Sequence, residues 1–271
     1  MFPNTSTPTM LTLTQSKILI RFVVLFVLFP VLSSCKVGRF FIYNFADIQD
    51  YKKFPARELV QSDTVFQFAQ SRAERAPKTI QVKDKEYDFE TYLKKNRTVA
   101  FLVVQNDSIQ YERYFKKYDH ASIVPSFSMA KSVTSILIGC AIDDGLIESV
   151  HEPVTKYIPE LQHRGFDAVT IEHLLQMTSG LDFNESYVNP FGDAATFYYG
   201  TNLRRSISRM KLKHPPGTQF NYVSGDTQIL GLLLERALKG KTVTAYLQEK
   251  LWSPLGMEYD ASWSVDRKRN S

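Results

Sequence analysis

The stretch that most constrains the fold runs from Pro125 to Gly145 and predicts a single helix. Ser128 and Lys131 lie three residues apart in its first turn, so their side chains project from the same side of the helix. Apolar residues recur at three- and four-residue steps, as they do on a helix face that packs against a core. These residues are Met129, Val133, Ile136, Leu137 and Cys140.

A hydroxyl beside an amine at the start of a helix suits nucleophilic catalysis. If packing removes water from the Lys131 ammonium, its charged form is disfavoured and the amine can accept the Ser128 proton. The positive end of the helix also favours negative charge on Ser128. We therefore predict Ser128 as a nucleophile and Lys131 as its base. The spacing alone is not specific, because Ser208 and Lys211 repeat it in a polar stretch. The alternative is a serine that caps the helix and a solvated lysine.

The first 34 residues are typical of an export signal. Lys17 and Arg21 precede an apolar run of eleven residues, Phe22 to Leu32. A bilayer span needs about 20 such residues, whereas this length suits a signal-peptide core. The run ends in Leu-Ser-Ser-Cys, which resembles the lipidation signal of bacterial lipoproteins. We expect a protein exported and lipid-anchored through Cys35 to a bacterial membrane, facing the periplasm or cell envelope. An ordinary signal peptide or an uncleaved anchor is the alternative.

Charge and cysteine content limit the possible partners. Residues 1–97 hold 15 Lys and Arg against 9 Asp and Glu, and residues 98–271 hold 18 against 19. The basic excess therefore precedes the predicted catalytic part, indicates no nucleic-acid partner and suggests at most attraction to anionic headgroups. Cys35 and Cys140 are the only cysteines, and Cys140 is expected in the core. The histidines lack metal-ligand spacing, so we expect no metal and no other cofactor. His173 is expected to be a hydrogen-bonded packing residue.

Turn signals predict two hairpins. Residues 35–97 are expected to form a tether and pre-domain segment, with a short strand pair at 79–87 about Lys83-Asp84. Its aromatic residues 40–45 would either pack on the domain or lie at the membrane surface. From Thr98 onward, two β-rich runs flank Asn106-Asp107, which predicts a hairpin. The first run is apolar nearly throughout and is predicted to be a buried strand. A hairpin that leads into the Ser128 helix indicates an α/β arrangement.

Three further helices are predicted downstream. Thr170 would cap a short helix at 171–177, and Asp226 would cap the helix that follows it. The last helix would run from Thr242 to about Trp252. The apolar face of the Asp226 helix is expected to consist of Ile229, Leu230, Leu233, Leu234 and Ala237.

Four blocks carry a family resemblance: SMAK at 128–131, IEHLLQMTSGL at 171–181, PGTQFNYVS at 216–224 and PLGM at 254–257. With them the chain resembles the penicillin-recognising serine hydrolases. Within that family it is most similar to the branch that holds class C β-lactamases, D-alanyl-D-alanine carboxypeptidases, esterases and nylon-oligomer (6-aminohexanoate dimer) hydrolases. Segments 184–187 and 225–228 are most similar to the last subgroup. The resemblance implies an α/β (α+β) fold over residues 98–271, in which helices flank an antiparallel sheet beside a mostly helical subdomain.

The resemblance also implies further site residues. Tyr222, in a Y-x-S motif, would face the nucleophile and relay a proton, since a nearby ammonium favours the phenolate. Tyr187-Val188-Asn189 fits the letters of the motif better, but Tyr222 has the matching context. Ser224 would hold Lys131 by a hydrogen bond. Tyr187 would contact substrate, or else be an ordinary loop aromatic.

The family's third motif, of K-T-G or H-x-G type, does not occur after Tyr222, so we expect C-terminal strands to be missing. The expected function is a serine hydrolase of esterase or amidase type acting on a small-molecule ester, an amide or a cell-wall peptide. A D,D-carboxypeptidase and a β-lactamase are alternatives. A non-catalytic envelope lipoprotein that binds peptidoglycan stems or a partner is the alternative from another class.

Overall fold

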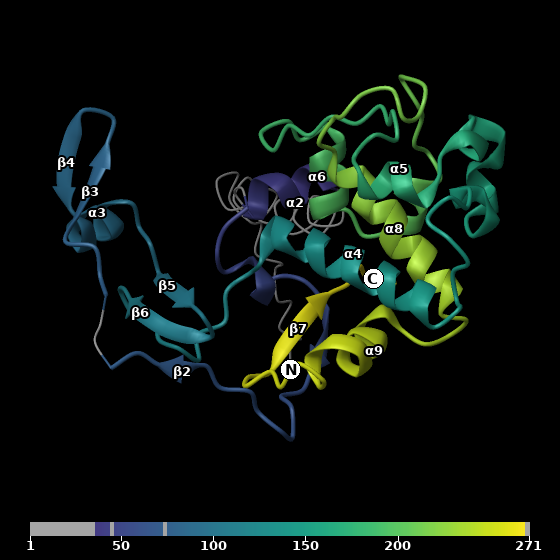
Figure 1. The fold of residues 1–271 in the computed structure, drawn as a ribbon. Helices are drawn as coiled ribbons and strands as arrows, with labels where there is room; N and C mark the ends of the chain where they lie inside the picture. Colours follow the sequence, from purple (N-terminus) through teal and green to yellow (C-terminus); the bar gives the residue numbers. More distant parts are fainter. Residues whose placement is uncertain (1–35, 44–45, 73–74, 269–271) are drawn as a thin grey trace, which may run out of the picture. The chain divides into compact units, whose positions relative to one another are not determined.

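The computed structural model describes residues 36–43, 46–72 and 75–268 (Figure 1). The predicted signal peptide, 1–34, and Cys35 lie outside the described residues. The chain forms two compact units, each assembled from separate stretches. Of the described residues, the first unit holds those from 36 to 47, 150–229 and 266–268, and the second holds those in 48–149 and 230–265. The expected boundary at Thr98 stays a prediction about domain organisation.

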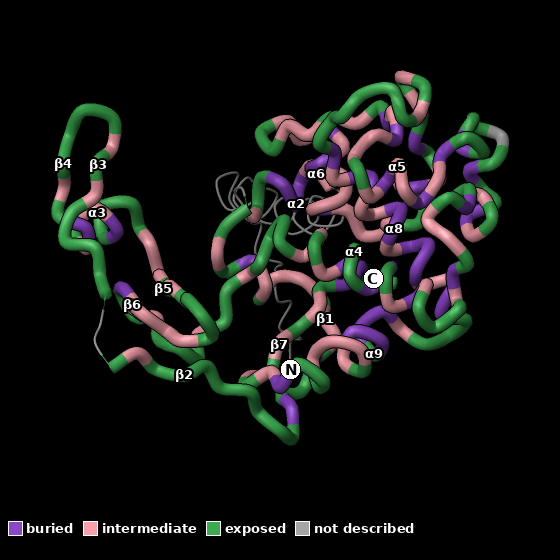
Figure 2. The backbone as a smooth tube through the Cα atoms, in the orientation of Figure 1, coloured by how far each residue is buried: buried purple, intermediate pink, exposed green. Residues whose placement is uncertain are grey.

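The predicted hairpin at 98–115 is confirmed in the second unit. Strand β5 (Ala100–Gln105) pairs antiparallel with β6 (Ser108–Tyr114), and β2 (Ala69–Gln70) adds to β6 in parallel. Asn106 and Asp107 both have positive φ, 51° and 54°, as a two-residue hairpin turn of type I′ requires. The prediction that the first strand is buried is wrong. Leu102 is 51% exposed, because only one face of the hairpin is covered (Figure 2).

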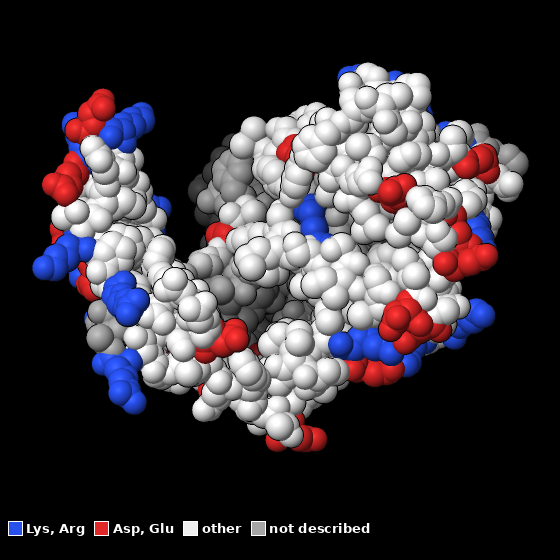
Figure 3. Space-filling view, viewed as in Figure 1, with Lys and Arg blue, Asp and Glu red and all other residues white. Residues whose placement is uncertain are grey.

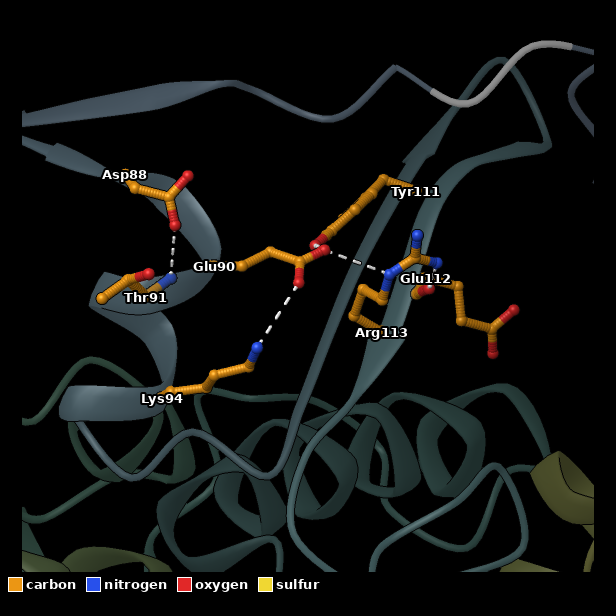
Figure 4. Close-up of polar contacts among 7 residues, drawn as sticks. All are labelled: Asp88, Glu90, Thr91, Lys94, Tyr111, Glu112 and Arg113. Atoms are coloured by element: carbon orange, nitrogen blue, oxygen red, sulfur yellow. Dashed lines mark hydrogen bonds and ion pairs between the residues drawn. The ribbon is translucent and has the colours of Figure 1, made fainter.

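Helix α3 (Phe89–Lys95) packs on the covered face of that hairpin. The cluster joins the two buried side chains of α3 to Tyr111 and Phe115 of the second predicted strand. Glu90 of α3 accepts hydrogen bonds from the Tyr111 hydroxyl and Arg113 Nε, both at 3.2 Å (Figure 4). This carboxylate therefore fixes the rotation of α3 on β6.

The predicted strand pair about Lys83 is also confirmed. Strand β3 (Thr79–Val82) pairs antiparallel with β4 (Lys85–Asp88), and Lys83 has φ +55°. Asp88 ends β4 and caps α3, since its side chain accepts the Thr91 N–H at 2.9 Å (Figure 4). Figure 3 shows Lys and Arg interspersed with Asp and Glu over β3, β4 and α3, so neither sign of charge dominates there.

A second pairing in this unit joins distant parts of the chain. Strand β1 (Ala56–Leu59) runs antiparallel to β7 (Ala261–Ser264), with Leu59 opposite Ala261. The predicted last helix is confirmed as α9 (Val243–Leu247), capped by Thr242, followed by a π-helical turn, η6 (Gln248–Trp252). A 3-10 turn, η1 (Asp50–Lys52), precedes β1.

The predicted helix at 125–145 is confirmed as a 3-10 turn, η2 (Phe127–Met129), followed by α4 (Ala130–Asp143). Its predicted apolar stripe is wrong in part. Met129 is 74% and Ile136 51% exposed, whereas the buried face consists of Thr134, Leu137, Ile138 and Ala141. The helix is apolar on several sides, so periodicity alone did not specify the side that is buried.

The first unit is mostly helical. It contains α2 (Lys36–Tyr43), α5 (Ile171–Leu175), α6 (Asp193–Tyr199) and α7 (Leu203–Ile207), with 3-10 turns at η3 (Val154–Lys156), η4 (Pro159–Arg164) and η5 (Phe166–Ala168). The Phe40 ring packs edge-on against Tyr199 at 5.3 Å, and Lys36 Nζ donates to Thr196 Oγ1 at 2.6 Å. Phe40 of the aromatic segment therefore packs on the domain, whereas Phe41 is 68% exposed, so a place for the segment at the membrane surface stays a prediction.

Helix α8 (Ser224–Ala237) passes through the boundary between the units. Its predicted apolar face is confirmed, with all five residues buried. Asp226 is not its cap, because the helix begins at Ser224. The predicted cap of α5 is confirmed: Thr170 and His173 form a reciprocal capping box, with His173 Nδ1 accepting the Thr170 N–H at 3.2 Å. Within the described residues, no helix has the length and apolar character needed to cross a bilayer.

Candidate active site

The structure brings Ser128 and Lys131 together in the second unit. Lys131 Nζ donates a hydrogen bond to Ser128 Oγ at 3.1 Å. Ser128 is solvent-exposed in the η2 turn, and Lys131 in the first turn of α4 is half-buried. Their separation is within the reach that a nucleophile and its base require. The roles of the two residues stay predictions.

The backbone just before Ser128 is strained. Phe127 has φ +46°, a left-handed conformation that costs a non-glycine residue about 1–2 kcal/mol. The next residues form a 3-10 turn rather than a helical turn, in which the Met129 N–H donates to the Ser126 carbonyl at 3.1 Å. Ser128 is therefore presented from a tight turn at the entrance of α4, and its side chain reaches the first turn of the helix.

A carboxylate in the first unit joins two of the other predicted site residues. Glu185 Oε1 accepts the Ser224 hydroxyl at 2.5 Å and the Tyr187 hydroxyl at 2.6 Å, while Oε2 accepts the Ser224 N–H at 2.8 Å. The last bond satisfies an N–H at the start of α8, and the negative charge lies at the favourable end of that helix. Partial burial and the Glu185 carboxylate raise the pKa of Tyr187.

Tyr222 lies two residues before α8 in the same unit and is 43% exposed. A negative charge on the Tyr222 phenol adds to the rise in the pKa of Tyr187. The structure thus groups Tyr187 and Ser224 around Glu185, and Tyr222 lies two residues before Ser224 along the chain. Ser128 and Lys131 belong to the other unit, so the proton relay through Tyr222 and the bond from Ser224 to Lys131 stay predictions.

The two most specific sequence blocks support this group by pairing their backbones. Asn221 N–H donates to the Met177 carbonyl at 2.9 Å, and Gly217 N–H donates to the Thr178 carbonyl at 2.8 Å. Gly180 has φ +76°, and a Cβ there would collide with the carbonyl oxygen of His214. The glycine of the MTSGL sequence is therefore required by a close approach of two backbone segments.

A buried carboxyl just past the second block bonds to the first block. Asp226 has no exposed surface, and its Oδ1 accepts the Ser179 hydroxyl at 2.6 Å. The other oxygen, Oδ2, is buried without a hydrogen-bond partner. Burial raises the pKa of Asp226 to about 7, against the opposing effect of Ser179. This pair connects the 178–180 turn to the first turn of α8, which carries Ser224.

Sequence reasoning assigned no role to Glu185 or to the Ser179–Asp226 pair. Glu185 lies in the segment used only for subgroup similarity, and a carboxylate two residues before a candidate tyrosine was the available signal. Asp226 was interpreted as a cap because aspartate before an apolar helix favours that role. Within the described residues, no three His, Cys, Asp or Glu side chains converge as metal ligands would.

Comparison with known proteins places the chain in a family. The beta-lactamase family model matches residues 88–269. The 6-aminohexanoate-dimer hydrolase of Paenarthrobacter ureafaciens is 30% identical over 190 residues, which are 66% of this chain and 48% of that protein. Esterase EstB of Burkholderia gladioli is 31% identical over 144 residues, 48% of this chain and 36% of the esterase. The chain thus spans about half the length of the first of these relatives.

A solved structure confirms the fold. It comes from Bacillus anthracis, with a provisional assignment as a 6-aminohexanoate-dimer hydrolase. It superposes with a TM-score of 0.73 at 23% identity, covering 82% of this chain and 61% of that one. The predicted α/β class and the predicted resemblance are both confirmed. The chain belongs to the beta-lactamase family.

Proposed function

We propose that this protein is a serine hydrolase that cleaves an ester or amide bond through an acyl-enzyme on Ser128. The proposal rests on one observation, the 3.1 Å hydrogen bond between Lys131 Nζ and Ser128 Oγ at the entrance of α4. A nucleophile needs a base within hydrogen-bond reach, and this amine meets that requirement. Membership of the beta-lactamase family supports the same chemistry.

The reaction takes two steps. Ser128 Oγ attacks the substrate carbonyl while its proton passes to the Lys131 amine, and the tetrahedral oxyanion accepts hydrogen bonds from backbone N–H groups, that of Ser128 included. Each such donor contributes about 3 kcal/mol. The proton then moves through Tyr222 to the leaving alcohol or amine, which departs. Water attacks the acyl-enzyme, loses its proton to the same relay and restores the Ser128 hydroxyl.

In this proposal Glu185 is a positioning residue. Its carboxylate bonds both the hydroxyl and the N–H of Ser224 and holds the Tyr187 hydroxyl. It therefore limits the rotation of Tyr187, the proposed substrate contact, and of the chain that carries Tyr222. A group held by two or more hydrogen bonds loses less freedom when substrate binds.

The proposed substrates are small-molecule esters or amides. Two relatives with similar sequence are an esterase and a 6-aminohexanoate-dimer hydrolase. Cell-wall peptides and β-lactams suit the same nucleophile, so a D,D-carboxypeptidase and a β-lactamase are tested beside an esterase. p-Nitrophenyl acetate, a D-Ala-D-Ala peptide and nitrocefin distinguish the three activities.

A fluorophosphonate probe tests the nucleophile directly, and the chain contains a matched control. Ser208 and Lys211 repeat the spacing of Ser128 and Lys131, but the Ser208 hydroxyl donates to the Arg205 carbonyl at 3.0 Å. Ser128→Ala and Lys131→Ala should abolish labelling, whereas Ser208→Ala and Lys211→Ala should label as the parent does. Labelling that persists in Ser128→Ala refutes the nucleophile. A folded parent that never labels refutes the enzyme and favours the non-catalytic binder.

We propose, separately, export and lipid attachment at Cys35. The support is the Leu-Ser-Ser-Cys sequence directly after the apolar run of Phe22 to Leu32. Radioactive palmitate fed to a bacterial host should label the parent and Cys140→Ser but not Cys35→Ser. Equal labelling of Cys35→Ser and the parent refutes the assignment.

A further inference from the structure

Helix α2 has one side that packs on the protein and another that faces solvent. Gly38, Arg39 and Phe40 are buried, whereas Phe41 is 68% and Ile42 44% exposed. Apolar side chains that stay in water forgo the free energy that burial would supply, so two of them side by side suggest a surface that something covers. We call Phe41 and Ile42 the apolar face of α2.

The buried side of α2 fixes the helix to α6, beside which it lies in Figure 1. The Phe40 ring packs edge-on against Tyr199 at 5.3 Å, and both rings form a buried cluster with Ala195. Lys36 Nζ donates to Thr196 Oγ1 at 2.6 Å, and this bond holds the first residue of the helix. Because α2 and α6 both belong to the first unit, α2 cannot leave that unit without breaking these contacts.

The apolar face lies close to the proposed lipid attachment. Helix α2 begins at Lys36, the residue directly after Cys35, so no linker separates the helix from that cysteine. Phe41 follows Lys36 by a distance of about 7.5 Å along the helix axis. Amphipathic helices bury their apolar side about 5–10 Å deep, at the boundary between headgroups and acyl chains. A lipid on Cys35 would therefore bring Phe41 and Ile42 within reach of that boundary.

The composition of α2 suits a bilayer surface. Its sequence, KVGRFFIY, contains no acidic residue, so anionic headgroups meet no like charge on this helix. The cation Arg39 is held within the protein, with its guanidinium over the Tyr43 ring at 5.4 Å. A single acyl chain holds a protein only weakly on a membrane, and a second apolar contact strengthens the attachment. The apolar face of α2 is suited to supply that second contact.

We propose that the apolar face of α2 inserts into the lipid surface beside the acylated Cys35. The contacts between α2 and α6 then hold the first unit in a fixed orientation on the bilayer. This inference rests on the proposed lipid attachment and goes beyond it. A lipid at the end of a flexible tether would leave the unit free to turn, whereas a lipid at the start of a docked helix does not.

Fluorescence quenching by lipids tests the insertion. The lipidated protein is purified from the membranes of a bacterial host and placed in vesicles of phosphatidylethanolamine and phosphatidylglycerol. In a Cys140→Ser background, Phe41→Cys carries a nitrobenzoxadiazole dye, and Asp167→Cys, at an exposed position of the same unit, carries the dye as a control. The dye at position 41 should emit at shorter wavelength and be quenched by nitroxide lipids, and the control dye should do neither. Equal quenching at both positions would overturn the proposal.

Two double substitutions measure what the apolar face contributes. Phe41→Ser with Ile42→Ser should transfer between vesicles about ten-fold faster than the parent, because the lipid is then the sole attachment. Leu102→Ser with Val104→Ser removes two exposed apolar side chains of β5 and should transfer at the parent's rate. Both pairs lie at exposed positions, so their melting temperatures should equal the parent's. Equal acceleration in the two pairs would show a general effect of lost apolar surface and would contradict the insertion of α2.

Radioactive palmitate separates this inference from the proposed lipid attachment. A parent that takes up no palmitate refutes both, whereas a labelled parent whose dye at position 41 is not quenched refutes the inserted face alone. A shift to shorter wavelength without quenching by nitroxide lipids would mean that a protein, a second copy included, covers the face, and this too would refute the insertion. Fluorophosphonate labelling of Ser128 should be the same in all these variants, because none of them changes a proposed catalytic residue.

Discussion

Asn in place of Asp226 should change how the stability of the protein depends on pH. Burial raises the pKa of this carboxyl to about 7, whereas an unfolded aspartate titrates near about 3.9. Between these values the folded chain binds one more proton than the unfolded chain. The contribution of this carboxyl to the free energy of unfolding is therefore complete below about pH 4 and is lost as pH rises through about 7.

The size of the effect follows from the two pKa values. A difference of about 3 units corresponds to about 4 kcal/mol of unfolding free energy lost from pH 4 to above pH 7. This is an upper figure, because Asp226 lies in the first turn of α8, where the helix dipole stabilises a negative charge. Asparagine stays neutral and keeps an oxygen to accept the Ser179 hydroxyl. Asp226→Asn should match the parent near pH 4 and exceed it by about 2–4 kcal/mol at pH 8.

Urea unfolding followed by far-UV circular dichroism, at several values between pH 4 and 8, measures this difference. Tryptophan fluorescence is unsuitable, because Trp252 and Trp263 both belong to the second unit and Asp226 to the first. Asp167→Asn, at an exposed position of the first unit, is the control and should follow the parent at every pH. Parallel profiles for Asp226→Asn and the parent would refute the reasoning, since the carboxyl would then titrate alike in both states.

Three further substitutions test other features. Gly180→Ala should destabilise the chain by more than about 2 kcal/mol in urea unfolding, because the positive φ and the overlap with the His214 backbone act together. Gly145→Ala, where φ is also positive but the added Cβ would meet open space, should cost about 1 kcal/mol. Equal losses in the two variants would contradict this account. Glu185→Gln should lower the pKa of Tyr187 towards its ordinary value, because the charge of the carboxylate is removed. A spectrophotometric titration measures this, with Tyr187→Phe to identify the signal of that phenol. An unchanged titration would contradict the role of the carboxylate. Asp107→Gly should stabilise the β5–β6 hairpin by about 0.5 kcal/mol in the same unfolding assay, because its φ is +54°, and a loss of stability would be the wrong sign.

Local signals in the sequence predicted much of the fold. Asn106-Asp107 specifies a hairpin turn through two residues that tolerate positive φ, whereas in the Lys83-Asp84 turn the positive φ falls on Lys83. Thr170 and His173 specify a helix start through a reciprocal cap. Ser128 and Lys131 are within hydrogen-bond reach because one helical turn separates them. Each of these features is decided within a few residues, so the sequence alone contains the information.

Features decided by tertiary packing were missed. Which side of α4 is buried, and whether Leu102 is exposed, depends on which surfaces other elements of the fold cover. A run of apolar residues does not show which of its sides will be covered. The bond between Glu185 and Ser224 joins residues 39 positions apart. Asp226 looked like a cap because the same residue type serves at a helix start and in a buried pair with a serine.

The pairing of β1 with β7 has a consequence for synthesis of the chain. Gln61, just after β1, bonds through its N–H to Asp260, 199 residues later. During translation β1 leaves the ribosome long before β7 exists, so its edge lacks this partner until residues 261–264 emerge. Contacts so distant in sequence close slowly, and an open strand edge can pair with other chains meanwhile. A nascent chain of this length should therefore depend on a holding chaperone until residues 261–264 have been made.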